Sequence, residues 1–243
     1  MRRKYGLLVA VFSLVVLTDQ GTKYLAVASL TNAFEHADRR TFAERVAGYL
    51  TLKNLDNDPA SPGGVDHRKP PVVVVASYWQ HKYVENPGAA WGLLARVSET
   101  WRRPFFHVVS LIALVVILGF YRRLQSDQAL MAVALSLILG GAMGNYFDRV
   151  IHGYVIDFVD WHWRHQPGLH WPTFNVADSA IVVGVLLLLA ETMFPKRLAG
   201  REALAQVGTP VAGTDPEPPK PDSLAPPVET PQVPPPPSPG EGP

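Results

Sequence analysis

Four long apolar stretches, separated by polar segments, dominate the pattern along the chain. They cover about residues 6–27, 105–121, 129–146 and 177–194, and each is rich in Val, Leu, Ile and Ala. About 20 apolar residues in a helix span the hydrocarbon core of a bilayer. A buried helix of a soluble domain is the alternative, but four helices with almost no charged face argue against it. We therefore predict four transmembrane helices.

The first stretch can also be interpreted as a cleavable signal peptide. Basic residues 2–4 precede it, and the Ala-Val-Ala of residues 26–28 resembles a cleavage site. However, Asp19 and Lys23 lie between the apolar run and that site, and the run is long enough to span a bilayer. We expect the segment to be retained as a helix.

Three clusters of basic residues set the expected orientation. They precede the first helix, fill the turn between the second and third, and follow the fourth, at residues 2–4, 122–123 and 196–201. With four spans all three clusters lie on one side, which the positive-inside rule makes the cytoplasmic side. All six tryptophans then fall near the outer helix ends, as an interfacial aromatic belt would.

The first outer segment, about residues 28–104, carries turn residues at 56–71 and a β-branched and aromatic run at 72–83. This run predicts a strand, and we expect a small sheet at the membrane surface. Residues 205–243 are rich in Pro, Glu, Ser and Gly and cannot bury enough apolar surface to fold. The predicted fold class is an all-α membrane protein, with a four-transmembrane-helix bundle over residues 1–204, a small extracytoplasmic β-sheet cradle and a disordered, proline-rich cytoplasmic tail.

The composition excludes several functions. The 243 residues carry a formal net charge of +1, whereas nucleic-acid-binding proteins normally show a clear basic excess. The absence of cysteine removes a thiol nucleophile, a thiolate metal site and any disulfide. His162, His165 and His170 invite a zinc interpretation, but no HExxH helix accompanies them, and we expect no metal site.

Polar residues near the outward helix ends are the main functional candidates, because a charge at the bilayer centre costs about 2.5–3.5 kcal/mol on insertion scales. Asp19 and Lys23 lie four residues apart in the first helix, in the favourable order for an ion pair. The pair either neutralises itself or positions a substrate, and the sequence leaves both interpretations open.

The third helix ends in small residues, at 140–144, which permit close helix packing. Asn145, Asp148 and Arg149 follow and share one helix face through their i, i+3 and i+4 spacing. A purely structural interpretation is a helix-packing surface with polar contacts, a polar staple, at its outer end. It suits Asn145 and Asp148 above all.

Two further carboxylates stand out. Asp157 is flanked by apolar residues, which would raise its pKa by desolvation, and Asp178 follows Asn175 by three residues, close to a capping box at the start of the fourth helix. An interfacial turn and helix capping would explain each alone. Together in a low-dielectric mouth they would share one proton, so that one activates water while the other polarises a scissile carbonyl.

These residues give the chain a resemblance to the lipoprotein signal peptidase family, also called signal peptidase II. The matching segments occur in the family's order, at residues 19–23, 86–92, 140–149, 155–158 and 174–181. The resemblance covers roughly residues 5–197. The chain departs from the family in a long insertion near residues 32–71, in its added tail, and at Pro87, where the family often has a small polar residue.

The resemblance implies an intramembrane aspartyl endopeptidase of the bacterial inner membrane that cuts N-terminal to the diacylglyceryl-modified Cys of a prolipoprotein. It places Asp157 and Asp178 on the catalytic positions. Seven residues fall on positions assigned to substrate binding: Asn86, Gly88, Asn145, Arg149, Asn175, Asp19 and Lys23. It also implies membrane lipids as partners, inhibition by globomycin, no cofactor, cytoplasmic termini and an active site near the extracytoplasmic face. We expect a monomer and no nucleic-acid partner.

Two alternatives stay open from the sequence. One is a small transporter, which would carry carboxylates near the middle of the membrane and broken helices, whereas here they lie at one mouth of the bundle. The other is a non-catalytic relative that binds lipoprotein precursors, which the intact motif residues disfavour without excluding.

Overall fold

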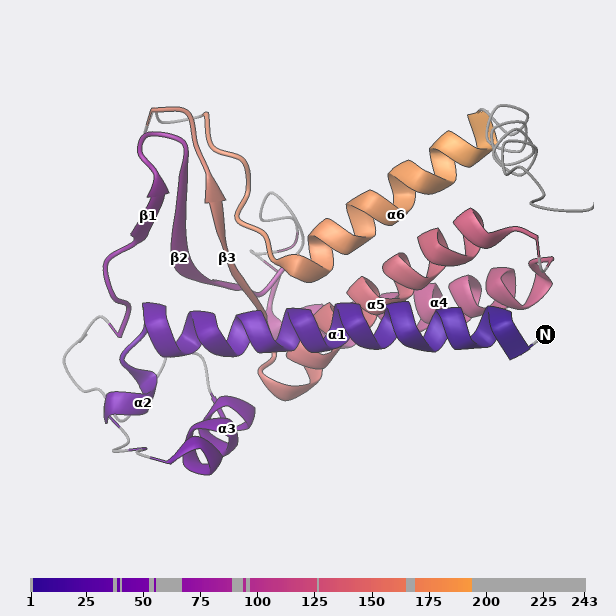
Figure 1. Cartoon of the computed structure of the whole chain (residues 1–243). Helices are drawn as coiled ribbons and strands as arrows, with labels where there is room; N and C mark the ends of the chain where they lie inside the picture. The colour runs from indigo at the N-terminus through magenta and orange to yellow at the C-terminus, as the bar shows by residue number, and fades with distance from the viewer. Residues whose placement is uncertain are drawn as a thin grey trace, which may run out of the picture. The chain divides into compact units, whose positions relative to one another are not determined.

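The computed structural model describes residues 2–36, 39, 41–52, 55, 67–88, 94, 97–125, 127–164 and 169–193. Within them the chain forms four long helices, two short ones and a three-stranded antiparallel sheet (Figure 1). The predicted fold class of a helical membrane protein with a small sheet is confirmed. The predicted disordered tail and most of the loop predicted at 56–71 lie outside the described residues.

The four long helices are each long and apolar enough to cross a membrane: α1 (Arg2–Leu30), α4 (Glu99–Arg123), α5 (Ala129–Ile151) and α6 (Val176–Met193). Three of them extend beyond the predicted apolar stretches. Hydropathy marks only the part suited to hydrocarbon, whereas backbone hydrogen bonding carries a helix on through polar residues. Thus α4 begins before Pro104, which costs the helix one backbone donor near its start.

The first helix and the end of the second span meet at one end of the bundle. The Lys4 ammonium donates to the backbone carbonyls of Arg122 and Leu124, at 3.1 and 2.7 Å. In return, the Tyr121 hydroxyl donates to the Lys4 carbonyl at 2.7 Å. Two of the three predicted basic clusters therefore share one end, as an even number of spans requires, and the sheet lies at the other end (Figure 1).

Helix α5 is the centre of the bundle and packs against α1, α4 and α6. Its glycines make the close approach possible, because a Cβ at Gly140 would lie 2.8 Å from Val15 Cβ of α1. A Cβ at Gly144 would lie 2.5 Å from Asp19 Oδ2 and 3.3 Å from Ala177 Cβ of α6. The small residues seen in the sequence are thus the contact surface for two neighbouring helices.

We expect Gly141→Ala to destabilise the fold by about 1–3 kcal/mol through overpacking. Its Cβ would collide with the Ala177 carbonyl oxygen and lie 2.8 Å from Ile181 Cγ1, so α5 and α6 would have to separate. Gly119→Ala in α4 is the matched control, because nothing lies within 4 Å of its Cβ. Thermal unfolding in detergent compares the two, and equal stability of both variants would contradict this packing.

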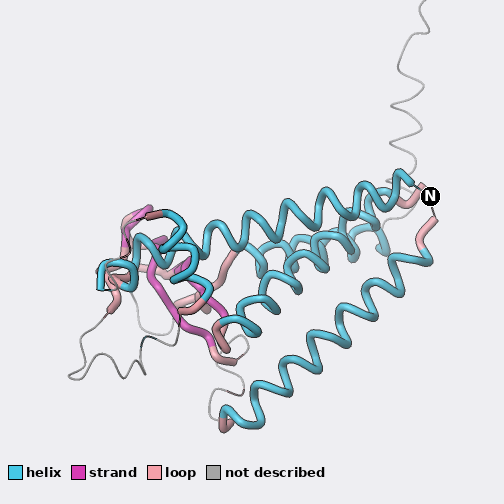
Figure 2. Tube along the Cα trace, turned by 90° about the horizontal axis from the view of Figure 1, so that it is seen from below, coloured by secondary structure: helices cyan, strands magenta, loops and turns pink. Residues whose placement is uncertain are grey.

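Helix α4 diverges from the other three spans towards the end that carries the sheet (Figure 2). It packs on α5 near the basic end, where Leu114 and Tyr121 are buried. Towards its start most of its apolar side chains are exposed, including Phe105, Val108 and Ile112. The divergence leaves space between α4 and the α5–α6 pair.

The sheet has the order β1-β2-β3 and consists of β1 (Val72–Val75), β2 (Trp79–Asn86) and β3 (Val155–Trp161). The single strand predicted at 72–83 is wrong in detail. Ser77, with φ of 72°, turns the chain there, so the run forms a hairpin of β1 and β2. The central strand β2 then pairs with β3, which places Asn86 opposite Val155 and Val84 opposite Asp157.

The insertion adds two short helices, α2 (Ala33–His36) and α3 (Phe42–Leu50), that the sequence pattern did not predict. Thr41 and Glu44 form a reciprocal capping box at the start of α3. The Tyr49 ring of α3 packs edge-on against Tyr24 of α1, with 5.8 Å between the centroids, and its hydroxyl donates to Gln20 Oε1 at 3.2 Å. The described part of the insertion is therefore anchored on the first span.

Candidate active site

A buried ion network joins three of the spanning helices. The Lys23 ammonium of α1 lies 2.8 Å from Asp19 Oδ2 and 2.8 Å from Asp148 Oδ2 of α5, and none of the three side chains is exposed. Asp19 Oδ1 also accepts the backbone N–H of Ala177, in the first turn of α6, at 2.9 Å. The predicted Asp19–Lys23 pair therefore exists, but a third residue completes it.

Asp148 extends this network to the sheet. Its Oδ2 accepts the backbone N–H of Ile156 at 3.0 Å, and its Oδ1 accepts Gln20 Nε2 at 2.9 Å. One carboxylate thus fixes the start of β3 against α1 and α5. The interpretation of Asp148 as a structural staple agrees with these contacts, and the position of Asp157, one residue after Ile156, depends on them.

The N-terminus of α6 is closed by a reciprocal pair of hydrogen bonds. Asn175 Oδ1 accepts the backbone N–H of Asp178 at 2.9 Å, and Asp178 Oδ2 accepts the backbone N–H of Asn175 at 3.3 Å. This is the capping box expected from the spacing. It orients the Asp178 carboxylate toward the preceding loop, and its other oxygen accepts Asn145 Nδ2 at 2.7 Å.

Asn175 also holds the second carboxylate. Its Nδ2 donates to Asp157 Oδ1 at 2.8 Å, while Asn86 Nδ2 of β2 donates to Asp157 Oδ2 at 2.9 Å. Asn175 Nδ2 also donates to Asn145 Oδ1, at 3.0 Å. Residues from β2, β3, α5 and the start of α6 therefore converge, and Asn175 connects directly to both aspartates.

Burial and the neighbouring Asp178 charge together raise the pKa of Asp157 from 3.8 to about 7. The amide donors of Asn86 and Asn175 and the charge of Lys23 act in the opposite direction. Because desolvation is the largest cause, the neutral acid is favoured in an apolar setting. A carboxyl group with a pKa near 7 can both accept and donate a proton at neutral pH, which is what acid–base chemistry requires.

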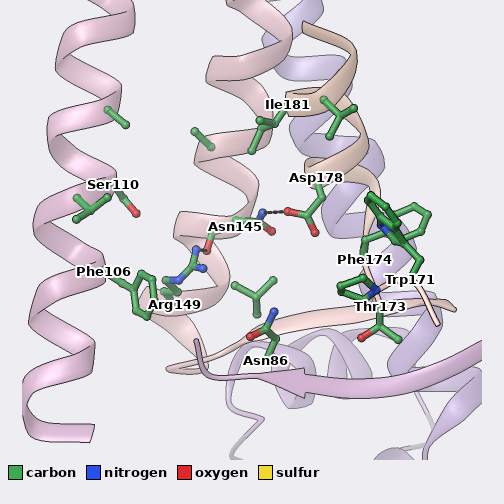
Figure 3. Close-up of a pocket in the computed structure, with 16 residues that line it drawn as sticks. Asn86, Phe106, Ser110, Asn145, Arg149, Trp171, Thr173, Phe174, Asp178 and Ile181 are labelled. Atoms are coloured by element: carbon green, nitrogen blue, oxygen red, sulfur yellow. Dashed lines mark hydrogen bonds between the residues drawn. The ribbon is translucent and has the colours of Figure 1, made fainter. Parts of the chain in front are cut away.

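A cavity of about 480 Å³ opens above these polar groups, between α4 and the α5–α6 pair (Figure 3). Asn86, Asn145 and Asp178 contribute polar groups to its lining, which is mainly apolar. The lining from α4 is Phe106, Val109, Ser110 and Ala113, and the lining from the loop before α6 is Trp171, Pro172, Thr173 and Phe174. An apolar cavity with a few convergent polar groups is the usual form of a ligand site.

Arg149 stands at the edge of this cavity (Figure 3). Its guanidinium donates to the Asn145 carbonyl at 3.2 Å and to the Gly88 carbonyl at 3.4 Å, and lies 4.8 Å from the centre of the Phe106 ring. Gly88 is itself fixed by its backbone N–H, which donates to Asn86 Oδ1 at 3.1 Å. Arg149 thus links α4, α5 and the end of β2.

The structure brings together five of the residues singled out in the sequence: Asn86, Asn145, Asp157, Asn175 and Asp178. Arg149 and Gly88 lie beside them. Asp19 and Lys23, which the sequence groups with the substrate-binding residues, are fully buried. Like Asp157 and Asn175, they are not among the residues that line the cavity. Lys23 donates a hydrogen bond to Asn145 Oδ1 at 3.1 Å, and its charge acts on the pKa of Asp157, so its position suits support of the site.

Several lining residues were not singled out in the sequence, among them Phe106, Ser110 and Thr173. Ser110 is one polar residue inside an apolar stretch, which is a signal that could have found it. Phe106 carries no such signal, because one apolar residue of a spanning helix is indistinguishable from its neighbours in the sequence. The position of Phe106 in the cavity lining follows from the path of α4, which the sequence does not predict.

Comparison with known proteins finds one family along most of the chain. The sequence model of the family described as signal peptidase (SPase) II matches residues 11–194. A lipoprotein signal peptidase from Anaeromyxobacter sp. (strain Fw109-5) is 48% identical over 186 residues, which are 76% of this chain and 84% of the relative. One from Geobacter sulfurreducens is 48% identical over 126 residues, which are 52% of this chain and 76% of the relative.

Two solved structures, each described as a bacterial membrane enzyme determined by the in meso method, resemble the fold. The one at 2.3 Å resolution is 26% identical, with a TM-score of 0.52, and the match covers 77% of this chain and 90% of that one. The one at 1.9 Å is 22% identical, with a TM-score of 0.55, and shows the fold alone. With four spans, a polar cluster at one end and a family match over residues 11–194, this chain belongs to the signal peptidase II family.

Proposed function

We propose that this lipoprotein signal peptidase is an aspartyl endopeptidase in which Asp157 and Asp178 activate water. The observation that carries the proposal is their shared partner. Asn175 donates through its side chain to Asp157 and through its backbone N–H to Asp178, at 2.8 and 3.3 Å. Two carboxylates tied to one residue form a pair that titrates as a unit, and one of them, Asp178, lines the apolar cavity.

The chemistry follows from this pair. The ionised carboxylate takes a proton from a water molecule as the water oxygen attacks the scissile carbonyl carbon, and the protonated carboxyl group donates a hydrogen bond to the carbonyl oxygen. Collapse of the tetrahedral intermediate breaks the C–N bond while a proton passes to the leaving amine. The pair ends with one proton, as it began, so no cofactor enters the reaction.

The cavity suits a substrate that arrives from the membrane. Its lining is mainly apolar and includes residues of the divergent helix α4, while Asp178 and Asn86 contribute polar groups. We propose that the diacylglyceryl chains of a prolipoprotein lie against α4 and that the peptide bond N-terminal to the lipidated Cys reaches the pair. Arg149, Gly88, Asn86 and Asn145 then border the substrate, and Asp19 and Lys23 position the groups that do so.

The proposal extends to the setting of the enzyme. The Lys4 end of the bundle would face the cytoplasm under the positive-inside rule, and the sheet and active site would face the other side of the bacterial inner membrane. The chain would act as a monomer surrounded by membrane lipids. Residues 1–204 would form the peptidase domain and residues 205–243 a cytoplasmic tail.

A transporter is the second candidate, and the geometry disfavours it. Both aspartates lie at the sheet end of the bundle, since Asp178 is in the first turn of α6 and Asp157 is in β3. Within the described residues the four spans run as continuous helices. A transport site near the middle of the membrane is usually built from broken helices.

We expect cleavage to fall as the pH is raised above about 7. The raised pKa of Asp157 means that the second proton of the pair leaves near that pH. The same shift affects stability, because the fold keeps this proton between pH 3.8 and about 7 while the unfolded chain loses it. Stability contributed by the neutral acid is therefore complete below pH 3.8 and is lost as pH rises to about 7. Initial rates of cleavage from pH 5 to 9 check the activity, and a rate that stays constant from pH 6 to 9 would contradict the shared proton.

Globomycin and lipidation together test the proposed substrate. Membranes containing this chain as their only signal peptidase II should cleave a diacylglyceryl-modified prolipoprotein and leave the unmodified precursor intact. Globomycin should block the cleavage if it occupies the cavity. Equal cleavage of both precursors, or cleavage indifferent to globomycin, would overturn the assignment of substrate and site.

A further inference from the structure

A cluster of possible metal ligands lies on the face of β3 that points away from the aspartate pair. Asp160 is three residues after Asp157, so the two carboxylates lie on opposite faces of the strand. Asp160, His162 and His170 each offer one ligand atom, and these atoms all lie within 4.8 Å of one another. The Asp160 and His162 side chains are almost completely buried, and His170 is partly exposed. The aspartate chemistry proposed above does not use this cluster.

Backbone pairing fixes the positions of all three residues. Asp160 lies opposite Gln80 in the β2–β3 ladder, and His162 faces His170 across an antiparallel bridge. The bridge is flanked by two backbone hydrogen bonds, from Trp163 N–H to the Leu169 carbonyl at 3.0 Å and from Trp171 N–H to the Trp161 carbonyl at 2.9 Å. The ligand residues are thus brought together by the fold before any ion binds.

Two of the distances between ligand atoms are close to those that a small ion requires. His162 Nδ1 lies 3.5 Å from Asp160 Oδ2, and His170 Nδ1 lies 3.6 Å from Asp160 Oδ1. Ligands about 2.0–2.2 Å from a tetrahedral Zn²⁺ lie roughly 3.3–3.6 Å apart. The two imidazoles stack with 26° between their planes. The two distances run to different oxygens of Asp160, so the imidazoles would have to turn toward a single ion for all three residues to bind it.

We propose that Asp160, His162 and His170 bind a divalent transition-metal ion of the Zn²⁺ class. Two imidazole nitrogens and one carboxylate oxygen form a donor set that Zn²⁺ accepts, with a fourth position for water. The ion would hold His162, directly after β3, to His170, in the segment that leads to α6. Its role would be structural, because it would bind on the face of the sheet opposite Asp157.

Lys82 and Gln80 compete with the ion for Asp160. The Lys82 ammonium lies 3.0 Å from Asp160 Oδ1, and Gln80 Nε2 donates to Oδ2 at 2.7 Å. The Lys82 side chain is one-third exposed, so its charged end can turn into solvent when an ion binds. This competition gives a distinctive prediction: removing the lysine charge strengthens metal binding, whereas a purely structural Asp160–Lys82 pair predicts no metal binding at all.

The test is a Zn²⁺ titration of the purified, tag-free, chelator-treated chain against a chromophoric competitor. We expect one Zn²⁺ per chain, binding at least tenfold weaker in His170→Ala and in His162→Ala, and tighter in Lys82→Met. His81→Ala is the matched control, because His81 lies one residue from Gln80 in β2 and so on the other face of the sheet. Co²⁺ in place of Zn²⁺ should give the visible absorption of a four-coordinate ion, and this absorption should be lost in His170→Ala.

Absence of saturable binding in the folded wild-type chain would overturn the proposal. So would a Zn²⁺ affinity that is unchanged in the His162→Ala, His170→Ala double variant. Thermal unfolding of each variant without metal separates loss of the ligand from loss of the fold. None of these measurements uses peptide cleavage, so their outcome is independent of the proposed peptidase mechanism.

Discussion

We expect Asp157→Asn and Asp178→Asn each to reduce cleavage about a thousandfold, within the range for removing a general acid or base. Either change leaves one ionisable group, so the remaining carboxylate can no longer exchange a proton with a partner. The hydrogen bonds to Asn175 and Asn145 hold the two carboxylates in one cluster, and Asp178 is the carboxylate that lines the cavity among the described residues. Single-turnover cleavage of a lipid-modified prolipoprotein by each purified variant measures the loss.

These variants should keep their fold. At pH 8, above its pKa of about 7, Asp157 is mostly an ionised buried carboxylate. An amide in its place removes that desolvation cost but accepts one hydrogen bond fewer, so Asp157→Asn should be about as stable as wild type at pH 8. Glu191→Gln, near the other end of α6, is the control and should cleave normally. Cleavage at near wild-type rates by a folded Asp157→Asn or Asp178→Asn variant would rule out the proposed pair.

Lys23→Met has the largest expected effect on stability. It leaves the buried carboxylates of Asp19 and Asp148 without the cation that lies 2.8 Å from each. Breaking a buried ion pair by removing one partner typically costs about 3–5 kcal/mol. Because Lys23 also donates to Asn145, which holds Asp178, cleavage should fall with stability. Thermal or detergent unfolding gives the change in the free energy of unfolding.

Lys69→Met is the matched control for this prediction. Lys69 pairs with Glu35 at 2.6 Å, but their side chains are 30% and 68% exposed. Exposed pairs contribute about 0–1 kcal/mol, so this variant should unfold nearly as wild type does. Adding Asp148→Asn to Lys23→Met should recover part of the loss, because one buried charge is removed. Equal stability of the Lys23→Met and Lys69→Met variants would contradict the buried network.

The spanning helices could be predicted from the sequence because hydrocarbon imposes a length and a composition that few other structures share. Their ends could not, since Glu99 and Ile151 belong to helices whose polar turns carry no hydropathy signal. The strand β3 was also missed. Its burial comes from contacts with β2 and with Asp148, which are distant in the sequence.

The polar residues of the site could be named from their spacing in the sequence. Which of them contact one another in the fold could not be predicted in this way. Asn175 was expected as a helix cap, and its second contact, with Asp157, depends on the pairing of β3. The sequence predicts substrate binding by Asp19 and Lys23, but it does not predict their complete burial, which accompanies the close approach of α5 at Gly144. Asp160 could not be joined to His162 and His170 until the bridge between the two histidines was known.

The most direct measurement is mass spectrometry of the products formed when the purified wild-type chain acts on a diacylglyceryl-modified prolipoprotein in detergent. The account predicts two products, a free signal peptide and a mature chain that begins with the lipidated Cys, and neither product in the Asp178→Asn reaction. A folded wild-type chain that leaves the substrate uncut, or that cuts it elsewhere, would contradict the account.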